Sequence, residues 1–91
     1  MLYLVCYDIS KDAVRGRVAK TLLDFGMRIQ ESVFECLLNE DLLARMMARL
    51  ERVPLDEDDR VRVYRICGPC AERIQIYGPG EATREPDFYL V

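Results

Sequence analysis

Histidine and tryptophan are absent from this 91-residue chain, and lysine occurs only at positions 11 and 20. Without histidine, the common Ser–His and Cys–His nucleophile pairs and histidine acid–base catalysis are excluded. Metal-assisted chemistry on carboxylates survives this exclusion. No apolar stretch approaches the roughly 20 residues that span a bilayer, and the chain opens without a basic leader or a cleavage site. We therefore expect a cytoplasmic protein with no membrane contact.

The basic residues are almost all of one kind. The chain carries 16 acidic and 13 basic residues, for a net charge of −3, which alone argues against a nucleic-acid partner. All but two of the basic residues are arginine, which binds phosphate through a planar fork. Arg15, Arg17 and Arg28 follow the first predicted strand, while acids gather at 56–59. These arginines form either a solvated helix face or one local basic surface.

Asp8 is the first candidate functional residue. It ends an almost unbroken apolar run, Leu2–Tyr7, and Ser10 follows as a candidate helix cap. Such a run predicts a central strand buried on both faces, with the carboxylate held at the rim of the sheet. Asp8 is either a metal ligand or a polar strand end that caps nearby amides. One carboxylate is a poor Mg²⁺ site, but two copies across a twofold axis would provide one.

Two helices are predicted from their caps and apolar spacing. The first runs from about Asp12 to Phe25, with Ser10 or Asp12 as N-cap and Gly26 as a left-handed C-cap. The second follows Asn39, a candidate N-cap with two acids after it, and ends before a proline.

The strands are predicted from extended apolar segments. Alternation in Met27–Leu38 breaks near positions 30–32, so this stretch is one bulged strand or, as we favour, two strands joined by a turn. Val61–Ile66 and Ile74–Tyr77 are further strands. The order of elements predicts an α+β fold, a ferredoxin-like βαββαβ sandwich with both helices on one face of an antiparallel sheet.

The C-terminal residues are predicted to leave this domain. Residues 1–78 form the ferredoxin-like domain, and 79–91 form a linker and an apolar strand, Asp87–Val91. An open sheet has edges that must be covered. We expect the last strand to pair with the edge of a second copy, which makes a homodimer.

Four cysteines and one acidic loop need separate interpretation. Cys67-Gly68-Pro69-Cys70 has the letters of a thioredoxin redox site, but the predicted strand after it does not fit that chemistry. A zinc site needs four ligands, which only two pairs from two chains would supply. We therefore expect a turn, with a local or an intersubunit disulfide. Cys6 and Cys36 lie in strands and are predicted to be buried, and Asp56–Asp59 is predicted to be a solvated loop.

Three motifs occur together in this order. The first is Tyr7-Asp8-Ile9-Ser10 at the end of an apolar strand. The second is Gly26, then Arg28, then Gln30–Glu35. The third is Asp59–Tyr64 before a cysteine pair and a segment that ends in glycine. Together they resemble the small CRISPR-associated adaptation protein family, described as endoribonucleases or endonucleases. The resemblance covers Leu2 to Gly78.

The resemblance implies a ferredoxin-like fold and a homodimer whose C-terminal strands cross to the partner. It also implies a role in antiviral defence through the acquisition of new spacers, beside a larger integrase subunit. In that role the dimer holds double-stranded DNA, and members are also described as metal-dependent nucleases on RNA or DNA. Carried over, Asp8 would be the catalytic carboxylate and bind Mg²⁺ or Mn²⁺ together with its twin in the dimer. The remaining site residues would be the phosphate-binding Arg15, Arg17 and Arg28 and the supporting Tyr7, Ser10 and Phe34.

Several functions stay open at this point. The dimer is either a DNA-binding scaffold or a metal-dependent nuclease whose substrate is double-stranded DNA or single-stranded RNA. A stand-alone, toxin-like ribonuclease and a non-catalytic regulatory module of ferredoxin-like fold are the alternatives.

Overall fold

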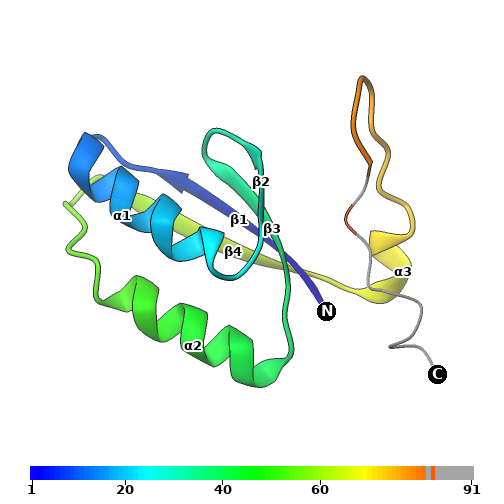
Figure 1. Ribbon diagram of the computed structural model, residues 1–91, viewed down its shortest axis with the longest axis horizontal. Coiled ribbons are helices and arrows are strands. Elements are labelled where there is room, and N and C mark those ends of the chain that lie inside the picture. Colours follow the sequence, from blue (N-terminus) through cyan, green and yellow to red (C-terminus); the bar gives the residue numbers. More distant parts are fainter. Residues whose placement is uncertain (82, 84–91) are drawn as a thin grey trace.

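A computed structural model of the chain describes residues 1–81 and 83, which form one sheet and the helices beside it (Figure 1). The elements, in chain order, are β1 (Leu2–Asp8), α1 (Asp12–Leu23), β2 (Met27–Gln30), β3 (Val33–Leu37), α2 (Glu40–Glu51), β4 (Arg60–Ile66) and α3 (Gly68–Ala71). No helix among the described residues is long and apolar enough to cross a membrane.

The four strands lie in the order β2-β3-β1-β4, and every neighbouring pair is antiparallel. Helices α1 and α2 cover one face of this sheet (Figure 1). This is the strand order of a ferredoxin-like sandwich. The predicted α+β fold is therefore confirmed, with β1 as one of the two central strands.

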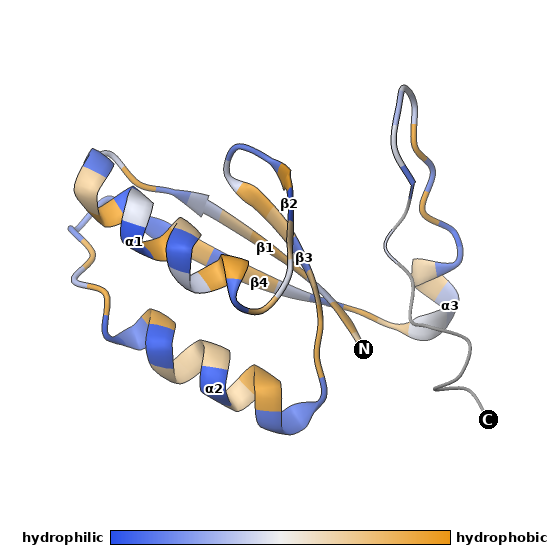
Figure 2. Cartoon of the chain, in the orientation of Figure 1, coloured by the Kyte–Doolittle hydropathy of each residue, from blue (hydrophilic) through white to orange (hydrophobic). Residues whose placement is uncertain are grey.

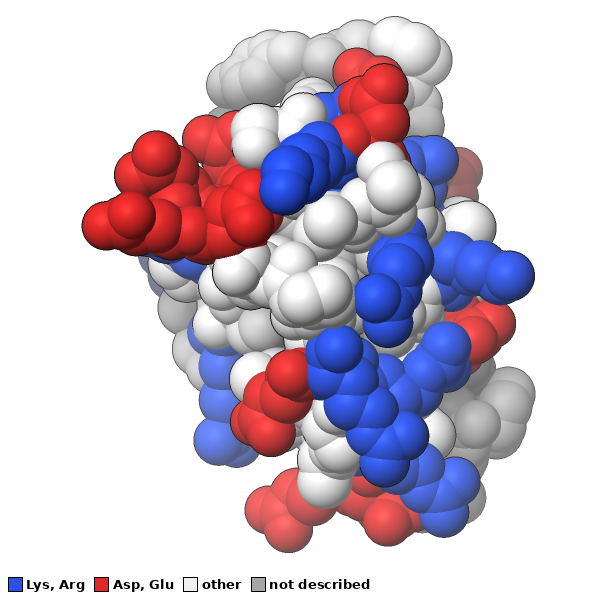
Figure 3. All heavy atoms as spheres, turned by 90° about the vertical axis from the view of Figure 1, so that its left-hand side faces the viewer, with Lys and Arg blue, Asp and Glu red and all other residues white. Residues whose placement is uncertain are grey.

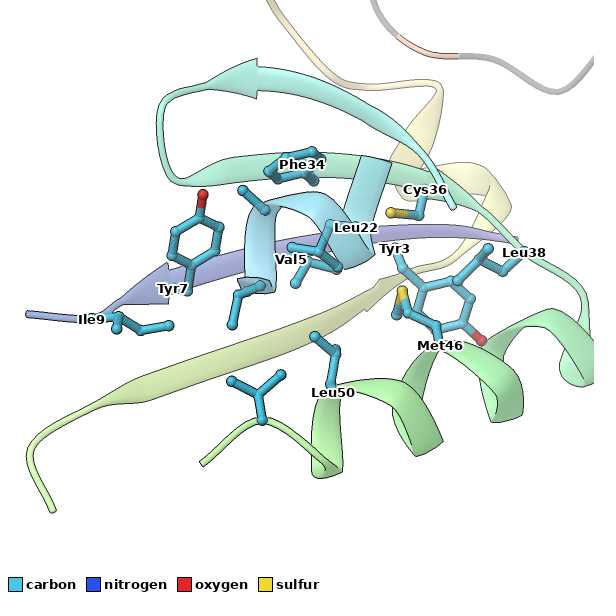
Figure 4. Close-up of a cluster of buried hydrophobic side chains, with 13 residues drawn as sticks. Tyr3, Val5, Tyr7, Ile9, Leu22, Phe34, Cys36, Leu38, Met46 and Leu50 are labelled. Atoms are coloured by element: carbon cyan, nitrogen blue, oxygen red, sulfur yellow. The ribbon is translucent and has the colours of Figure 1, made fainter. Parts of the chain in front are cut away.

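The core lies between β1 and the two helices. Tyr3, Val5 and Tyr7 alternate along β1 and are at most 7% exposed. Their side chains meet Leu22 of α1, Phe34 of β3 and Met46 of α2 (Figure 4). Figure 2 shows the matching apolar stripes on the helices. The opposite face of β1 is only partly covered, because Leu2 is buried while Leu4 and Cys6 are half-buried. The prediction that β1 is buried on both faces is therefore correct for the face toward the helices and only partly correct for the other face.

The stretch from Met27 to Leu38 forms two strands, as favoured above. The turn lies at residues 31–32, and a register shift falls between Arg28 and Gln30. The turn and the bulge, considered as alternatives, are therefore both present. All four residues of β2 are exposed, as befits an edge strand.

The predicted N-cap is correct for α2 and wrong for α1. Asn39 accepts a hydrogen bond from the Leu42 N–H at 2.8 Å, so the predicted cap of α2 is confirmed. At α1 the N-cap position is Lys11, and its side chain makes no capping hydrogen bond. The predicted Ser10 and Asp12 caps are therefore wrong. Asp12 lies in the first helical turn, where its charge still suits the helix dipole.

Gly26 has a different role from the one predicted. Its backbone is not in the left-handed region, which among the described residues holds only Gly78 and Gly80. A Cβ on Gly26 would lie 2.4 Å from Cys36 Sγ and 2.4 Å from the Glu35 carbonyl oxygen. Glycine is needed because the chain between α1 and β2 passes directly over β3.

The segment after β4 departs most from the prediction. Positions 74–77 form no strand among the described residues, and Cys67–Cys70 is not a plain turn but the start of α3. This part of the chain lies apart from α1 and α2 (Figure 1). Thr83 donates a hydrogen bond from Oγ1 to Glu35 Oε1 at 2.5 Å. The predicted strand Asp87–Val91 lies outside the described residues.

Candidate functional site

Asp8 is the last residue of β1, and its side chain is exposed. The antiparallel register places it opposite Arg60, and it places Cys6 opposite Arg62. These four residues and Tyr7 line a shallow open hollow at the rim of the sheet. No ion pair or side-chain hydrogen bond to the Asp8 carboxylate is formed within residues 1–81 and 83. The carboxylate is thus accessible in a hollow that two arginines also line, while Arg60 donates to the Glu57 and Asp59 carbonyl oxygens at 2.8 Å and Arg62 to the Tyr64 hydroxyl at 3.2 Å.

The loop that follows Asp8 is held by a buried carboxylate, Asp59, which is 6% exposed. Its Oδ1 accepts a hydrogen bond from the Ser10 N–H at 3.2 Å, and its Oδ2 accepts one from the Asp56 N–H at 2.9 Å. These hydrogen bonds, with that from Asp56 the larger influence, lower the pKa of Asp59. Lys11 also pairs with Asp56 at 3.1 Å. The loops before α1 and before β4 are therefore tied together beside Asp8.

Asp59 corrects the prediction of a fully solvated acidic loop. Its three acidic neighbours at 56–58 are exposed as expected, but Asp59 is a structural residue. Its partner Ser10 lies 49 positions away in the sequence. No local pattern reveals such a contact, so sequence reasoning missed it.

Arg15, a predicted phosphate ligand, is directed into the same loop. Its Nη1 donates to the carbonyl oxygens of Ile9 at 2.9 Å and Ser10 at 3.4 Å. Its Nη2 pairs with Asp12 on the same face of α1. Arg15 therefore braces the chain that follows Asp8, and its charge stays at this end of the sheet.

Arg28, Tyr7 and Phe34 form one group on the other side of β1. Arg28 donates to the Glu31 carbonyl oxygen through Nη2 at 3.0 Å and Nε at 3.2 Å, and to the Tyr7 hydroxyl at 3.3 Å. Its guanidinium carbon lies 5.4 Å from the centre of the Phe34 ring, within range of a cation–π contact. Tyr7 itself donates to the Glu31 carbonyl oxygen at 3.0 Å. Arg28 is thus fixed in position while its surface stays exposed.

Arg17 lies on the exposed surface of α1, and its guanidinium has no partner among the residues that the structure describes. Arg60 and Arg62 are two further cations that sequence reasoning did not single out. Their alternation on β4 places both on one face, but only the register with β1 shows that this face carries Asp8. Figure 3 looks at this end of the molecule, where Lys and Arg side chains form a band flanked by acidic groups.

The comparisons with known proteins agree on one family. A family model described as CRISPR associated protein Cas2 matches residues 1–74. The chain belongs to the Cas2 family. It is 42% identical to a CRISPR-associated endoribonuclease Cas2 of Chloroflexus aurantiacus, with all of both chains covered.

Two solved structures have the same fold as this Cas2-family chain. A hypothetical protein of Thermus thermophilus is 40% identical with a TM-score of 0.75, covering 88% of this chain and 93% of that one. Cas2 of Streptococcus pyogenes, in a crystal structure at pH 6.5, is 29% identical with a TM-score of 0.73. The match covers 86% of this chain and 100% of that one. The family resemblance inferred from the three motifs is therefore confirmed.

The described residues of this Cas2-family chain do not by themselves form a cluster of metal ligands. Within the described residues, no group of three or more His, Cys, Asp or Glu side chains is close enough to hold a metal ion. Besides Asp8, the hollow at the end of β1 is lined by Cys6, Tyr7 and two arginines. Arginine repels a cation, so the two arginines of the hollow do not favour a metal ion at Asp8 alone.

Proposed function

We propose that this protein acts in CRISPR adaptation as a cytoplasmic homodimer that binds double-stranded DNA beside an integrase subunit. Its membership of the Cas2 family supports the adaptation role, and the family resemblance supports the integrase partner. The observation that carries the proposal is the surface around the end of β1. There an exposed carboxylate, Asp8, lies opposite Arg60 in the register and shares a shallow hollow with Arg60 and Arg62.

Phosphate binding at this surface is supported by how the arginines are held. Arg28 is fixed by its contacts to Tyr7 and Glu31, so little side-chain freedom is lost when it meets a phosphate. Arg17 is exposed and without a partner in the described part of the chain, so its whole fork is open to a ligand. Because the protein is net acidic, DNA affinity depends on this local surface and falls steeply with salt.

Dimerisation is supported by the sheet face that no helix covers. The register places Tyr64 beside Leu4, and Met27 beside Glu35, on that face. Tyr64 is 45% exposed and Met27 is 62% exposed. They lie on the two edge strands of the sheet, with Glu35 and Leu4 between them. Exposed apolar side chains spread across a sheet face suit a surface that another chain covers. A second copy of this chain is the occupant that the family resemblance favours.

Nuclease activity is the second part of the proposal. In the dimer, Asp8 and the partner's Asp8 would hold one Mg²⁺ or Mn²⁺ ion, and the chemistry that the ion would supply is the activation of water toward a phosphodiester bond. The arginines around Asp8 neutralise the charge that develops on the phosphate. RNA and DNA are both substrates that this chemistry admits, and relatives from Chloroflexus aurantiacus and Mycobacterium tuberculosis are named endoribonucleases.

The binding part is tested with three matched arginine variants. Arg17→Gln and Arg28→Gln should weaken duplex DNA binding, whereas Arg45→Gln should not. Arg45 is an exposed arginine of α2 that pairs with Asp41 at 3.1 Å. Each arginine that no longer binds a phosphate should reduce the slope of log K against log salt by about 0.9. Equal affinities and salt slopes for all three variants and the wild type would refute the proposed surface.

The metal part is tested through its linkage to dimerisation. If one ion is shared by two Asp8 carboxylates, Mn²⁺ must tighten the dimer, and Asp8→Asn must remove this effect. Sedimentation equilibrium with and without Mn²⁺ measures both. A dimer that Mn²⁺ tightens equally in wild type and Asp8→Asn contradicts a shared ion.

Cleavage is tested separately, with RNA and DNA substrates and identically purified proteins. Asp8→Asn should lose Mn²⁺-dependent cleavage while it keeps DNA binding. Equal cleavage by both proteins would refute the proposed nuclease activity of Asp8, and the scaffold role would be the part of the proposal that stands. Spacer acquisition in cells that survives Asp8→Asn but fails with Arg17→Gln would identify the scaffold as the biological role. A stand-alone ribonuclease or a regulatory module predicts no dependence of acquisition on either residue.

A further inference from the structure

Cys67 and Cys70 form a pair of exposed thiols at the end of the sheet opposite Asp8. Cys67 directly follows β4, and Cys70 is the third residue of α3. All four cysteines of the chain are free thiols in this structure. Sequence reasoning disfavoured redox chemistry here because a strand, and not a long helix, was expected after the motif. That strand is absent from the described residues, and a helix does begin at the motif, although α3 has only four residues.

The backbone brings the two cysteines within reach of each other. Cys67 is the N-cap of α3, and its carbonyl oxygen accepts a hydrogen bond from the Ala71 N–H at 2.9 Å. In such a helical turn, residues three apart have Cα atoms about 5 Å from each other. A disulfide needs Cα atoms roughly 4.4–6.8 Å apart. The pair can therefore close without moving β4 or unwinding the turn.

The two thiols differ in their readiness to ionise. Hydrogen bonds from the Cys70 thiol and the Cys70 N–H, and the charge of Arg65, lower the pKa of Cys67. The hydrogen bond to Cys67 and the charge of its thiolate raise the pKa of Cys70. A thiol that ionises early beside one that ionises late is suited to attack and resolution, respectively.

We propose that Cys67 and Cys70 are a redox-active dithiol, which low-molecular-weight disulfides convert reversibly into an intramolecular disulfide. The Cys67 thiolate attacks the small disulfide, forms a mixed disulfide and releases one small thiolate. Cys70 loses its proton, attacks the Cys67 sulfur and releases the second small thiolate. The protein is oxidised by two electrons and the small disulfide is reduced by two. This proposal does not depend on nucleic-acid binding.

The other two cysteines are less accessible to a small disulfide than Cys67 and Cys70. Cys36 is fully buried, and burial together with the charge of Glu35 raises its pKa to about 11. Cys6 is half-buried on β1 and lies on the face opposite Cys36. They serve as internal controls. Both should stay reduced in a buffer that oxidises Cys67 and Cys70.

The test is a redox titration of the full chain with reduced and oxidised glutathione, followed by trapping with N-ethylmaleimide and trypsin digestion. Cleavage after Arg65 and Arg73 releases residues 66–73, which contain both cysteines of the pair and no other. In wild type this peptide should change from the form that carries two N-ethylmaleimide groups to an unalkylated form, two hydrogen atoms lighter than the free dithiol, as the buffer becomes oxidising. Reduction should reverse the change. Cys6 and Cys36 should stay reduced throughout, and N-ethylmaleimide should alkylate both when it is added together with denaturant.

Two single variants separate the attacking and the resolving thiol. Cys70→Ser should accumulate glutathione on Cys67, because nothing resolves the mixed disulfide. Cys67→Ser should react more slowly, because Cys70 lacks the hydrogen bonds and the Arg65 charge that lower the pKa of Cys67. Three results would overturn the proposal. They are stable glutathione adducts on wild-type Cys67, a peptide 66–73 linked to a second copy of itself, and zinc that wild type retains and Cys67→Ser loses.

Discussion

Substitution of glycine by alanine should change the stability of the protein in opposite directions at Gly26 and at Gly16. A Cβ on Gly26 would lie 2.4 Å from Cys36 Sγ, 2.4 Å from the Glu35 carbonyl oxygen and 2.9 Å from Cys36 Cα. Two of these atoms belong to the backbone of β3 and cannot rotate away. A Cβ on Gly16, in contrast, would meet no atom within 4 Å.

The magnitudes follow from these distances. Overpacking of a filled site costs about 1–3 kcal/mol, and we expect the upper end for Gly26→Ala because β3 must shift. A destabilisation of about 3 kcal/mol lowers the Tm of a domain of this size by roughly 12–24 °C. Gly16 lies inside α1, where alanine is favoured over glycine by about 0.5–1 kcal/mol. Gly16→Ala should therefore raise the Tm by a few degrees.

Denaturant and thermal unfolding at one fixed protein concentration measure both variants, since association would otherwise change the apparent stability. The double variant Gly26→Ala/Cys36→Ala adds a further test. It should recover only part of the stability, because the clash with the Glu35 carbonyl oxygen stays. Equal stabilities of Gly26→Ala and Gly16→Ala would refute the close approach of this segment to β3.

Three further substitutions test the contacts around β1. Because hydrogen bonds from the Asp56 and Ser10 N–H groups hold the pKa of Asp59 below its ordinary value, Asp59→Asn should destabilise the protein above about pH 4. The difference from wild type should disappear as the pH falls through the lowered pKa, which denaturant titrations across an acidic pH series will show. Tyr7→Phe removes a hydroxyl with two partners and should cost about 0.5–1.5 kcal/mol of unfolding free energy. Phe34→Ala empties a fully buried site and should cost about 3–5 kcal/mol, measured in the same way.

Features that depend on neighbouring residues were predictable from the sequence. The Asn39 cap, the two strands within 27–38 and the order of helices and strands up to β4 all follow from local spacing and capping. The prediction of the α1 N-cap was wrong because several polar residues lie near the start of this helix. Lys11 holds the N-cap position that Ser10 or Asp12 was expected to fill. The prediction of a strand at 74–77 was wrong because a short apolar run has little preference for extended structure without a partner strand.

The surroundings of Asp8 could not be predicted, because each contact joins distant parts of the chain. Asp59 reaches Ser10 across 49 positions, and Arg28 reaches Tyr7 across 21. Arg60 lies beside Asp8 only through the register of β4 against β1. The sequence indicated the residue types that bind phosphate. It did not indicate which of them are committed to holding the backbone.

The contacts around Asp8 bear on the proposed pairing of two chains. The chain after Asp8 is held from two directions, by Arg15 on the Ile9 carbonyl oxygen and by Asp59 on the Ser10 N–H. The carboxylate therefore sits on a rigid support, which suits a ligand whose position must be fixed. The same rigidity keeps Asp59 from moving in as a second ligand, since it is buried and committed to the loop. An arrangement that places two such strand ends face to face would supply the missing carboxylate without any rearrangement of either chain.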